Sequence, residues 1–176
     1  MGWIEQINHR FRSSRVLKTE KAFVQDRCPV NLTSMPEPSA VLDADELKIR
    51  VEDVDNIIDG NPFCDIVALC EHSDEPTAVL IEAKTDRTNL NARTREAISQ
   101  LSWSFDHFNN ISAICNLVPI DCKRYPVLTF TKITDAVLRS PSVKDEARKF
   151  RRHHRARIQY VRAGDDIWQA IHQNTP

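Results

Sequence analysis

The sequence predicts an α/β protein with a central mixed β-sheet flanked by helices. Residues 63–84 contain two apolar runs joined by a polar turn, residues 91–108 have the spacing of an amphipathic helix, and residues 125–133 read as a further strand. Strands joined by a short turn pair antiparallel, whereas a strand, helix and strand in succession form a right-handed crossover between parallel strands. The sheet is therefore expected to be mixed.

Length and composition indicate one globular domain over residues 1–176, with an N-terminal helical part at 1–36 and a sheet core with a basic C-terminal helix at 40–176. Of the 176 residues, 41% are hydrophobic and 28% are charged, which is ordinary for a globular protein. No apolar run approaches the about 20 residues that span a bilayer, and the N-terminus lacks the apolar segment of a secretory signal. We expect a cytoplasmic protein without a membrane contact.

The N-terminal third is predicted to be helical at first and extended later. Residues 14–25 place Leu17, Ala22 and Phe23 at helical spacing, so residues 3–26 are expected to form one broken helix or two short ones. Residues 31–39 read as a loop. Residues 47–54 alternate apolar and charged side chains, which predicts a half-exposed strand.

Two acidic residues and one lysine interrupt the apolar pair of strands at 63–84. Asp65 lies in the first strand, and Glu82 and Lys84 end the second, after a turn at 71–76. Side chains alternate along a strand, so Glu82 and Lys84 share a face, and pairing of the strands brings Asp65 beside them. Buried charges are costly unless they are paired or bind a metal, and hard cations such as Mg²⁺ prefer carboxylates. The trio predicts a metal site.

The C-terminal half continues the alternation of helices and strands. Asn91 is a good N-cap for the helix at 91–108, and the strand at 125–133 is expected to run parallel to the Glu82 strand. A basic helix follows at 141–155, then a strand at 157–162 and a closing helix at 165–172. The expected order is α–β–β–β–α–β–α–β–α.

The pattern of Asp65, a turn and Glu82-x-Lys84 resembles the PD-(D/E)xK nuclease superfamily, which has the restriction-endonuclease-like fold; the resemblance covers residues 60–105 directly. It implies that Asp65 and Glu82 bind one or two Mg²⁺ or Mn²⁺ ions, with the Ala83 carbonyl as a further ligand, while Lys84 assists the attacking water. Cys64 stands where the superfamily's name places a proline, which many members lack.

The same resemblance suggests further site residues. Members often carry a Gln-Leu pair on the helix after the Glu-x-Lys strand, and Gln100-Leu101 matches it. The first core helix often supplies another acid, for which Glu20 is the first candidate and Glu5 the second. Ser104 stands where the exonuclease branch usually has a tyrosine, so we expect an endonuclease.

Uneven charge predicts a nucleic-acid-binding surface, although the net charge is only −1. Arginine clusters bind phosphates without reading sequence, and the candidates are arginines of the basic helix and of the segment after Lys84: Arg148, Arg151, Arg152, Arg155, Arg87 and Arg93. Neighbours on a helix point about 100° apart, so His153 and His154 are expected to be surface residues or phosphate contacts. DNA is favoured over RNA, and a homodimer or larger assembly is compatible with so small a chain.

Three alternatives stand beside the nuclease. An Asp and a Glu-x-Lys at strand ends can be an ordinary ion pair. The fold can also serve a non-catalytic nucleic-acid-binding or assembly subunit, or an interaction protein whose basic helix binds an acidic partner. Retention of Asp65, Glu82 and Lys84 together favours the enzyme. Only three glycines are present, which argues against glycine-rich phosphate loops. Five cysteines without a CxxC pair are expected to be buried and reduced.

Overall fold

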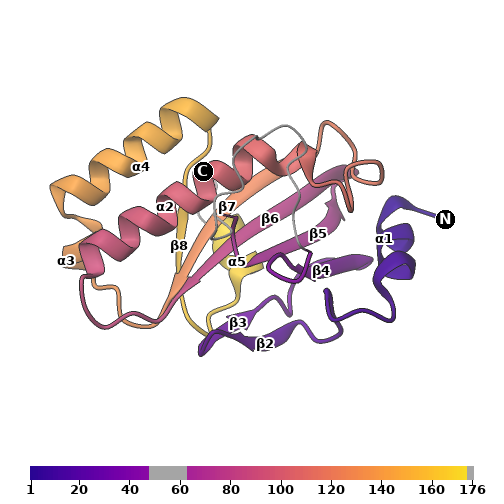
Figure 1. Cartoon of the computed structure of the whole chain (residues 1–176), viewed down its shortest axis with the longest axis horizontal. Coiled ribbons are helices and arrows are strands. Elements are labelled where there is room, and N and C mark those ends of the chain that lie inside the picture. The colour runs from indigo at the N-terminus through magenta and orange to yellow at the C-terminus, as the bar shows by residue number, and fades with distance from the viewer. Residues whose placement is uncertain (48–62, 174–176) are drawn as a thin grey trace.

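A computed structural model describes residues 1–47 and 63–173, which form an α/β arrangement around one mixed sheet (Figure 1). The six-stranded sheet has the order β1-β4-β5-β6-β7-β8. Its strands are β1 (Leu17–Lys18), β4 (Ser39–Asp43), β5 (Ile66–His72), β6 (Glu75–Lys84), β7 (Lys123–Phe130) and β8 (Gln159–Arg162). A separate hairpin consists of β2 (Ala22–Gln25) and β3 (Cys28–Asn31).

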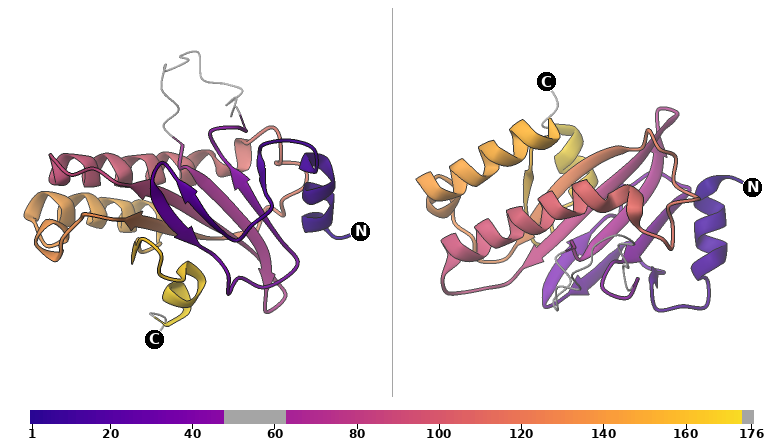
Figure 2. Two further views of the ribbon diagram at one scale, coloured as in Figure 1. Left: turned by 90° about the horizontal axis from the view of Figure 1, so that it is seen from below. Right: turned by 45° about the horizontal axis from the view of Figure 1, so that its top comes forward.

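Helices cover both faces of this sheet (Figure 2). The helices α2 (Leu90–His107) and α4 (Pro141–His154) lie side by side on one face, and α5 (Ile167–Gln173) lies on the other. The remaining helical elements are α1 (Trp3–Phe11), the short α3 (Asp135–Leu138) and the 3₁₀ turn η1 (Phe108–Asn110). The predicted fold class, a central mixed sheet flanked by helices, is confirmed.

The directions of the strands follow from their connections. β4, β5 and β6 pair antiparallel, whereas β6, β7 and β8 pair parallel. The helix α2 connects β6 to β7 and α4 connects β7 to β8, because parallel neighbours need a crossover long enough to return the chain. The predicted parallel pairing of the Glu82 strand with the strand around 125–130 is confirmed.

Alternation along β6 decides which way its polar residues point. Ala78 and Leu80 belong to the apolar core that faces α2, while Val79 and Ile81 belong to the core on the opposite face with α5. Glu82 and Lys84 continue the first row, since side chains of a strand repeat every second residue. The predicted shared face of Glu82 and Lys84 is confirmed.

The N-terminal prediction is partly wrong. Only Trp3–Phe11 is helical within residues 1–36, and the segment 14–25, predicted as a helix, contains β1 and β2 instead. The prediction missed β4 as well. In β1, Leu17 pairs with Leu42 and Lys18 with Val41, so pairing with a distant strand overrides a local spacing that suits a helix.

The C-terminal elements agree with the sequence within one to two residues at most ends. α2, α4, β8 and α5 coincide with the segments predicted at 91–108, 141–155, 157–162 and 165–172, and β7 starts two residues earlier and ends three residues earlier than predicted. Most of the strand predicted at 47–54 lies outside the described residues. The hairpin turn is tighter than predicted, because Ser73 and Asp74 both adopt positive φ values of 51° and 64°.

The cysteines are free thiols, four of them buried and Cys115 half-buried. Burial raises the pKa of the Cys70 and Cys122 thiols to about 12, so these two stay protonated near neutral pH. Across residues 1–47 and 63–173, no helix combines the length and apolar character needed to cross a membrane.

Candidate active site

Asp65 immediately precedes β5 and is held by the backbone of the neighbouring strand β6. Its Oδ2 atom accepts a hydrogen bond of 2.8 Å from the Ala83 N–H. The ladder between β5 and β6 ends at the pair Ile66 and Ile81, so the carboxylate takes the place of a β5 partner for Ala83, whose other side pairs with Thr129 of β7. The N–H and C=O of one strand residue face the same neighbour; we therefore infer that the Ala83 carbonyl is directed to the Asp65 side.

Glu82 and Lys84 form an ion pair on the face of β6 that looks toward α2. The Lys84 Nζ lies 2.8 Å from Glu82 Oε1 and donates a hydrogen bond of 3.1 Å to Gln100 Oε1 on α2. Glu82 is only 1% exposed, and its second oxygen, Oε2, has no hydrogen-bond partner among the described residues. An unpaired buried carboxylate oxygen is energetically costly, and a ligand at this atom would offset that cost.

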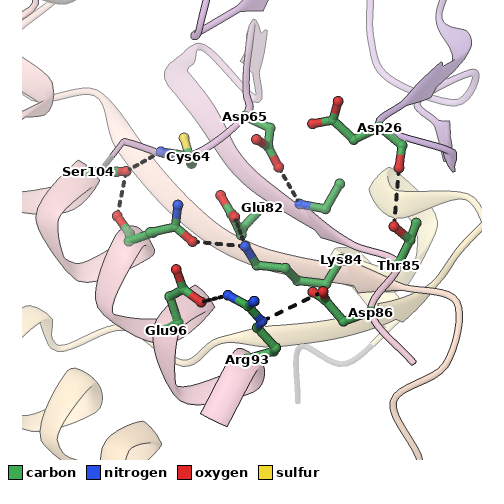
Figure 3. A network of polar contacts seen from close by, with 12 residues as sticks. Asp26, Cys64, Asp65, Glu82, Lys84, Thr85, Asp86, Arg93, Glu96 and Ser104 are labelled. Carbon is green, nitrogen blue, oxygen red and sulfur yellow. Dashed lines mark hydrogen bonds and ion pairs between the residues drawn. The ribbon is translucent and has the colours of Figure 1, made fainter. Parts of the chain in front are cut away.

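Two further acids, which the sequence did not single out for the site, lie beside Asp65. Carboxylate oxygens of Asp26, Asp45 and Asp65 all lie within 4.8 Å of one another. Asp26 occupies the turn between β2 and β3, and Asp45 follows β4. Figure 3 shows the Asp26 side chain extending toward Asp65. The Asp26 carbonyl accepts a hydrogen bond of 3.3 Å from Thr85 Oγ1, which ties the turn to the end of β6.

Burial and the charges of neighbouring carboxylates raise the pKa of Asp65 and of Glu82. Burial, together with the nearby charges of Asp45 and Asp26, raises the pKa of Asp65 to about 6 despite the Ala83 hydrogen bond and Lys84. Burial and the charge of Asp65 raise the pKa of Glu82 to about 8 despite the ion pair with Lys84. Both groups therefore hold protons near neutral pH more readily than exposed acids do.

For Lys84 the neighbouring charges outweigh burial, whereas burial has the larger effect on the pKa of Asp65 and of Glu82. Burial lowers its pKa, but the ion pair and hydrogen bond with Glu82 and the charge of Asp65 outweigh burial, so the pKa is raised. The ammonium therefore keeps its charge over the whole neutral range. Since an ammonium has three donors and Glu82 and Gln100 take two, one N–H remains for a water or a phosphate oxygen.

The donor atoms of this site fit a hard divalent cation. The set consists of carboxylate oxygens from Asp65, Glu82, Asp26 and Asp45 with the inferred Ala83 carbonyl, and Mg²⁺ or Mn²⁺ prefers such oxygen ligands. Clustered carboxylates with raised pKa values repel one another when ionised, and a cation removes that repulsion. The unpartnered Oε2 of Glu82 offers a ready ligand.

The other predicted site residues differ in how they are placed. Glu20 is exposed between β1 and β2 and does not lie on a helix, so the prediction of its helical position is wrong. Glu5 lies on α1, where its carboxylate accepts a hydrogen bond of 2.9 Å from the Gly2 N–H. The acids that the fold brings beside Asp65 are Asp26 and Asp45. A short tight hairpin carries Asp26, and no motif in the sequence marks it.

The two arginines predicted near the site lie on the segment that follows β6. Arg87 is exposed in the loop before α2. Arg93 on α2 is half exposed and pairs with Asp86 at 3.7 Å and with Glu96 at 2.9 Å, as Figure 3 shows. A guanidinium has five N–H donors, so Arg93 can contact a phosphate while it keeps both carboxylates, although these offset part of its positive charge.

The four predicted arginines of α4 are all exposed and share one surface depression of about 570 Å³, which we call the arginine groove; it is lined by Arg148, Arg151, Arg152 and Arg155. Residues three and four positions apart lie on one face of a helix, and this spacing explains why all four meet. The result is a concentrated positive surface on the outer side of α4.

Comparisons of this chain with protein-family models, with curated proteins and with solved structures find no match. The geometry of the site itself is therefore the basis for assigning a function.

Proposed function

We propose that this protein is a Mg²⁺- or Mn²⁺-dependent nuclease that hydrolyses phosphodiester bonds, acting on DNA as an endonuclease. The observation that carries the proposal is the convergence of Asp65, Glu82 and Lys84 in one site, where one Glu82 oxygen has no hydrogen-bond partner within residues 1–47 and 63–173. These residue types are those that the resemblance to the PD-(D/E)xK superfamily implies, and a mixed sheet flanked by helices is the core it implies.

An ordinary structural ion pair is the competing explanation of the same residues, and the surroundings disfavour it. A pair of Glu82 and Lys84 alone would not require Asp65, Asp26 and Asp45 to gather nearby. Buried ion pairs often contribute little to the stability of the folded state. Further carboxylates beside such a pair lower that stability, because like charges repel one another. Such a cost is typical of functional sites, where groups are held ready for a ligand or a reaction.

Each residue then has a distinct task. Asp65 and Glu82, with the Ala83 carbonyl, would hold the cation, and Asp26 and Asp45 would complement its charge. When bound, a divalent cation lowers the pKa of water and stabilises negative charge on a phosphate. Lys84 directs its remaining N–H toward the attacking water, and the amide of Gln100 fixes the ammonium through the hydrogen bond of 3.1 Å.

The arginine groove is the proposed contact for the phosphate backbone of the substrate. Contacts to phosphates position a nucleic acid without reading its sequence, so we expect little sequence specificity from this surface alone. We propose that the enzyme is cytoplasmic and that it works alone, as a homodimer or within a larger assembly. DNA remains favoured over RNA as the substrate.

The decisive experiment measures cleavage of plasmid DNA and of linear single-stranded DNA with and without Mg²⁺ or Mn²⁺. The wild type is compared with Asp65→Ala and Lys84→Ala, and Lys123→Ala serves as the control because Lys123 lies at the opposite end of the parallel pair from Lys84. We expect metal-dependent cleavage that both site variants lose and the control keeps.

A second candidate function, a non-catalytic nucleic-acid-binding or assembly subunit, predicts a different result. No cleavage would occur in any metal, and calorimetry would detect no Mn²⁺ binding that depends on Asp65. Salt-sensitive binding to DNA with no cleavage would favour this candidate, while absence of any DNA binding would favour a protein that uses its basic helix on an acidic partner.

A further inference from the structure

A second group of metal-ligating side chains lies away from the carboxylate cluster, where α2 and α4 run side by side. Asp106 on α2 and His153 and His154 on α4 each offer one ligand atom, and these three atoms lie within 4.8 Å of one another. We propose that Asp106, His153 and His154 bind a divalent transition-metal ion of the Zn²⁺ type and thereby clamp α2 to α4. This proposal does not depend on the proposed nuclease activity.

The distances suit a tetrahedral ion. The His153 Nε2 lies 3.0 Å from Asp106 Oδ1, and the His154 Nδ1 lies 3.9 Å from the same oxygen. Bonds of about 2.0–2.2 Å from Zn²⁺ to histidine nitrogen and carboxylate oxygen separate neighbouring ligand atoms by roughly 3.3–3.6 Å at tetrahedral angles. The two observed separations lie on either side of that range, so small side-chain movements are sufficient.

Adjacent histidines diverge along a helix, yet here both rings turn toward one acid. They lie at the C-terminal end of α4, and their ring centroids are 4.5 Å apart. Asp106 comes from the neighbouring helix, and its Oδ1 atom lies near a nitrogen of each ring. The expectation that His153 and His154 are surface residues or phosphate contacts considered α4 alone and did not include Asp106.

A hydrogen bond to one ring nitrogen of His154 leaves the other nitrogen available to bind a metal. Its Nε2 lies 2.7 Å from Ser102 Oγ on α2. When the Nε2–H donates to this hydroxyl, the lone pair remains on Nδ1, the atom that faces Asp106. A metal-ligating histidine usually has its other nitrogen fixed by such a hydrogen bond.

The fourth position of the ion is open. Asp106, His153 and His154 line a cavity of about 880 Å³ together with Arg124, Arg151, Arg155 and Arg157. These arginines oppose a bare dication, so we expect water or an anion to take the open position and the affinity to be moderate. Three protein ligands with one open position are typical of zinc sites that admit a further ligand.

The experiment titrates metal-free protein carrying Asp65→Asn, which weakens the carboxylate cluster, with Co²⁺ and then with competing Zn²⁺. We expect one ion per chain, the visible absorbance of four- or five-coordinate Co²⁺ without thiolate charge-transfer bands, and displacement by Zn²⁺. Asp106→Asn and His153→Ala, which replace exposed side chains, are each expected to weaken Zn²⁺ binding at least tenfold, and Ser102→Ala by about tenfold.

His9→Ala provides the matched control, because His9 is an exposed helical histidine on α1; it is expected to bind Zn²⁺ like the parent. Saturating Zn²⁺ should also raise the melting temperature of the parent, since a ligand that binds only the folded state stabilises it, and should raise it less in Asp106→Asn. Unchanged affinity in both Asp106→Asn and His153→Ala, or thiolate bands in the Co²⁺ spectrum, would overturn the proposal.

Discussion

The carboxylate of Asp65 substitutes for a strand: its Oδ2 accepts the 2.8 Å hydrogen bond from Ala83 N–H at the point where the β5–β6 ladder ends. One side chain thus has a structural contact and a place in the candidate metal site. Substitutions that separate charge from hydrogen bonding can distinguish the two roles.

Asp65→Asn keeps an oxygen that can accept from Ala83, whereas Asp65→Ala leaves a buried N–H without its partner. We expect Asp65→Ala to lower the free energy of unfolding by about 1–3 kcal/mol and Asp65→Asn to lower it by less. Both should lose Mn²⁺ binding. Urea unfolding and calorimetric titration measure the two effects, and equal stability of the two variants would contradict the structural role.

Glu82→Gln tests the burial of an ionised carboxyl. The folded-state pKa of Glu82 is about 8, above its ordinary 4.5, so the folded state binds more protons and the metal-free protein loses stability as pH rises from about 4.5 to 8. The glutamine stays neutral. We expect metal-free Glu82→Gln to melt at least about 5 °C higher than the wild type at pH 9.

Two controls accompany the Glu82→Gln measurement. At pH 4 both forms are neutral at this position and should melt together, apart from small packing differences. Saturating Mn²⁺ should reverse the order at pH 8, because only the wild type offers the cation a charged carboxylate at this position. A constant difference in melting temperature at every pH would show that ionisation of Glu82 is not the cause.

Asp26→Asn tests one of the acids that the structure adds to the site. Asp26 adopts a left-handed conformation with φ of 47°, and asparagine tolerates that conformation, so the hairpin should fold normally. We expect Mn²⁺ affinity to fall roughly tenfold or more. Asp121→Asn, an exposed acid in the crossover between α2 and β7, should leave the affinity unchanged; a matching loss there would assign the effect to net charge.

Gln100→Leu tests the positioning of Lys84. The substitution removes the acceptor at 3.1 Å from the ammonium but retains the volume of the side chain. We expect the cleavage rate to fall by about tenfold or more, with Mn²⁺ affinity within a factor of two. The exposed neighbour Ser99→Ala should change neither quantity. Loss of Mn²⁺ binding in Gln100→Leu would place this residue among the determinants of metal affinity instead.

The arginine groove can be tested by the salt dependence of DNA binding. For each phosphate contact removed, the slope of log K against log salt should become shallower by about 0.9. We expect the double variant Arg148→Ala, Arg152→Ala to bind DNA more weakly. Its slope should be shallower by up to about twice the change for one phosphate contact. Arg10→Ala with Arg12→Ala removes the same charge from exposed positions near α1 and should leave the slope nearly unchanged.

The sequence predicted the parts of the molecule that local patterns encode. Alternation around Glu82 and helical spacing around Leu101 are short-range signals, and the elements that carry them formed as expected. It failed where long-range pairing decides the structure. Leu17 looks helical until Leu42 is available as a strand partner, and Asp26 comes near Asp65 only through a hairpin anchored to Thr85. No single-sequence pattern reports a contact across forty residues.

The candidate metal site joins a central strand to a much smaller sheet. β6 is hydrogen-bonded to a strand on both sides, whereas the turn bearing Asp26 belongs to a separate two-stranded sheet, joined to the C-terminal segment by a bridge between Asn31 and Asp166. A two-stranded sheet is less stable than a larger one, so amide hydrogens of β2 and β3 should exchange with solvent sooner than those of β6. A cation that bridges Asp26 to Asp65 would therefore slow hydrogen exchange in the hairpin more than in β6. The size of that effect measures how strongly the bound ion orders the N-terminal segment.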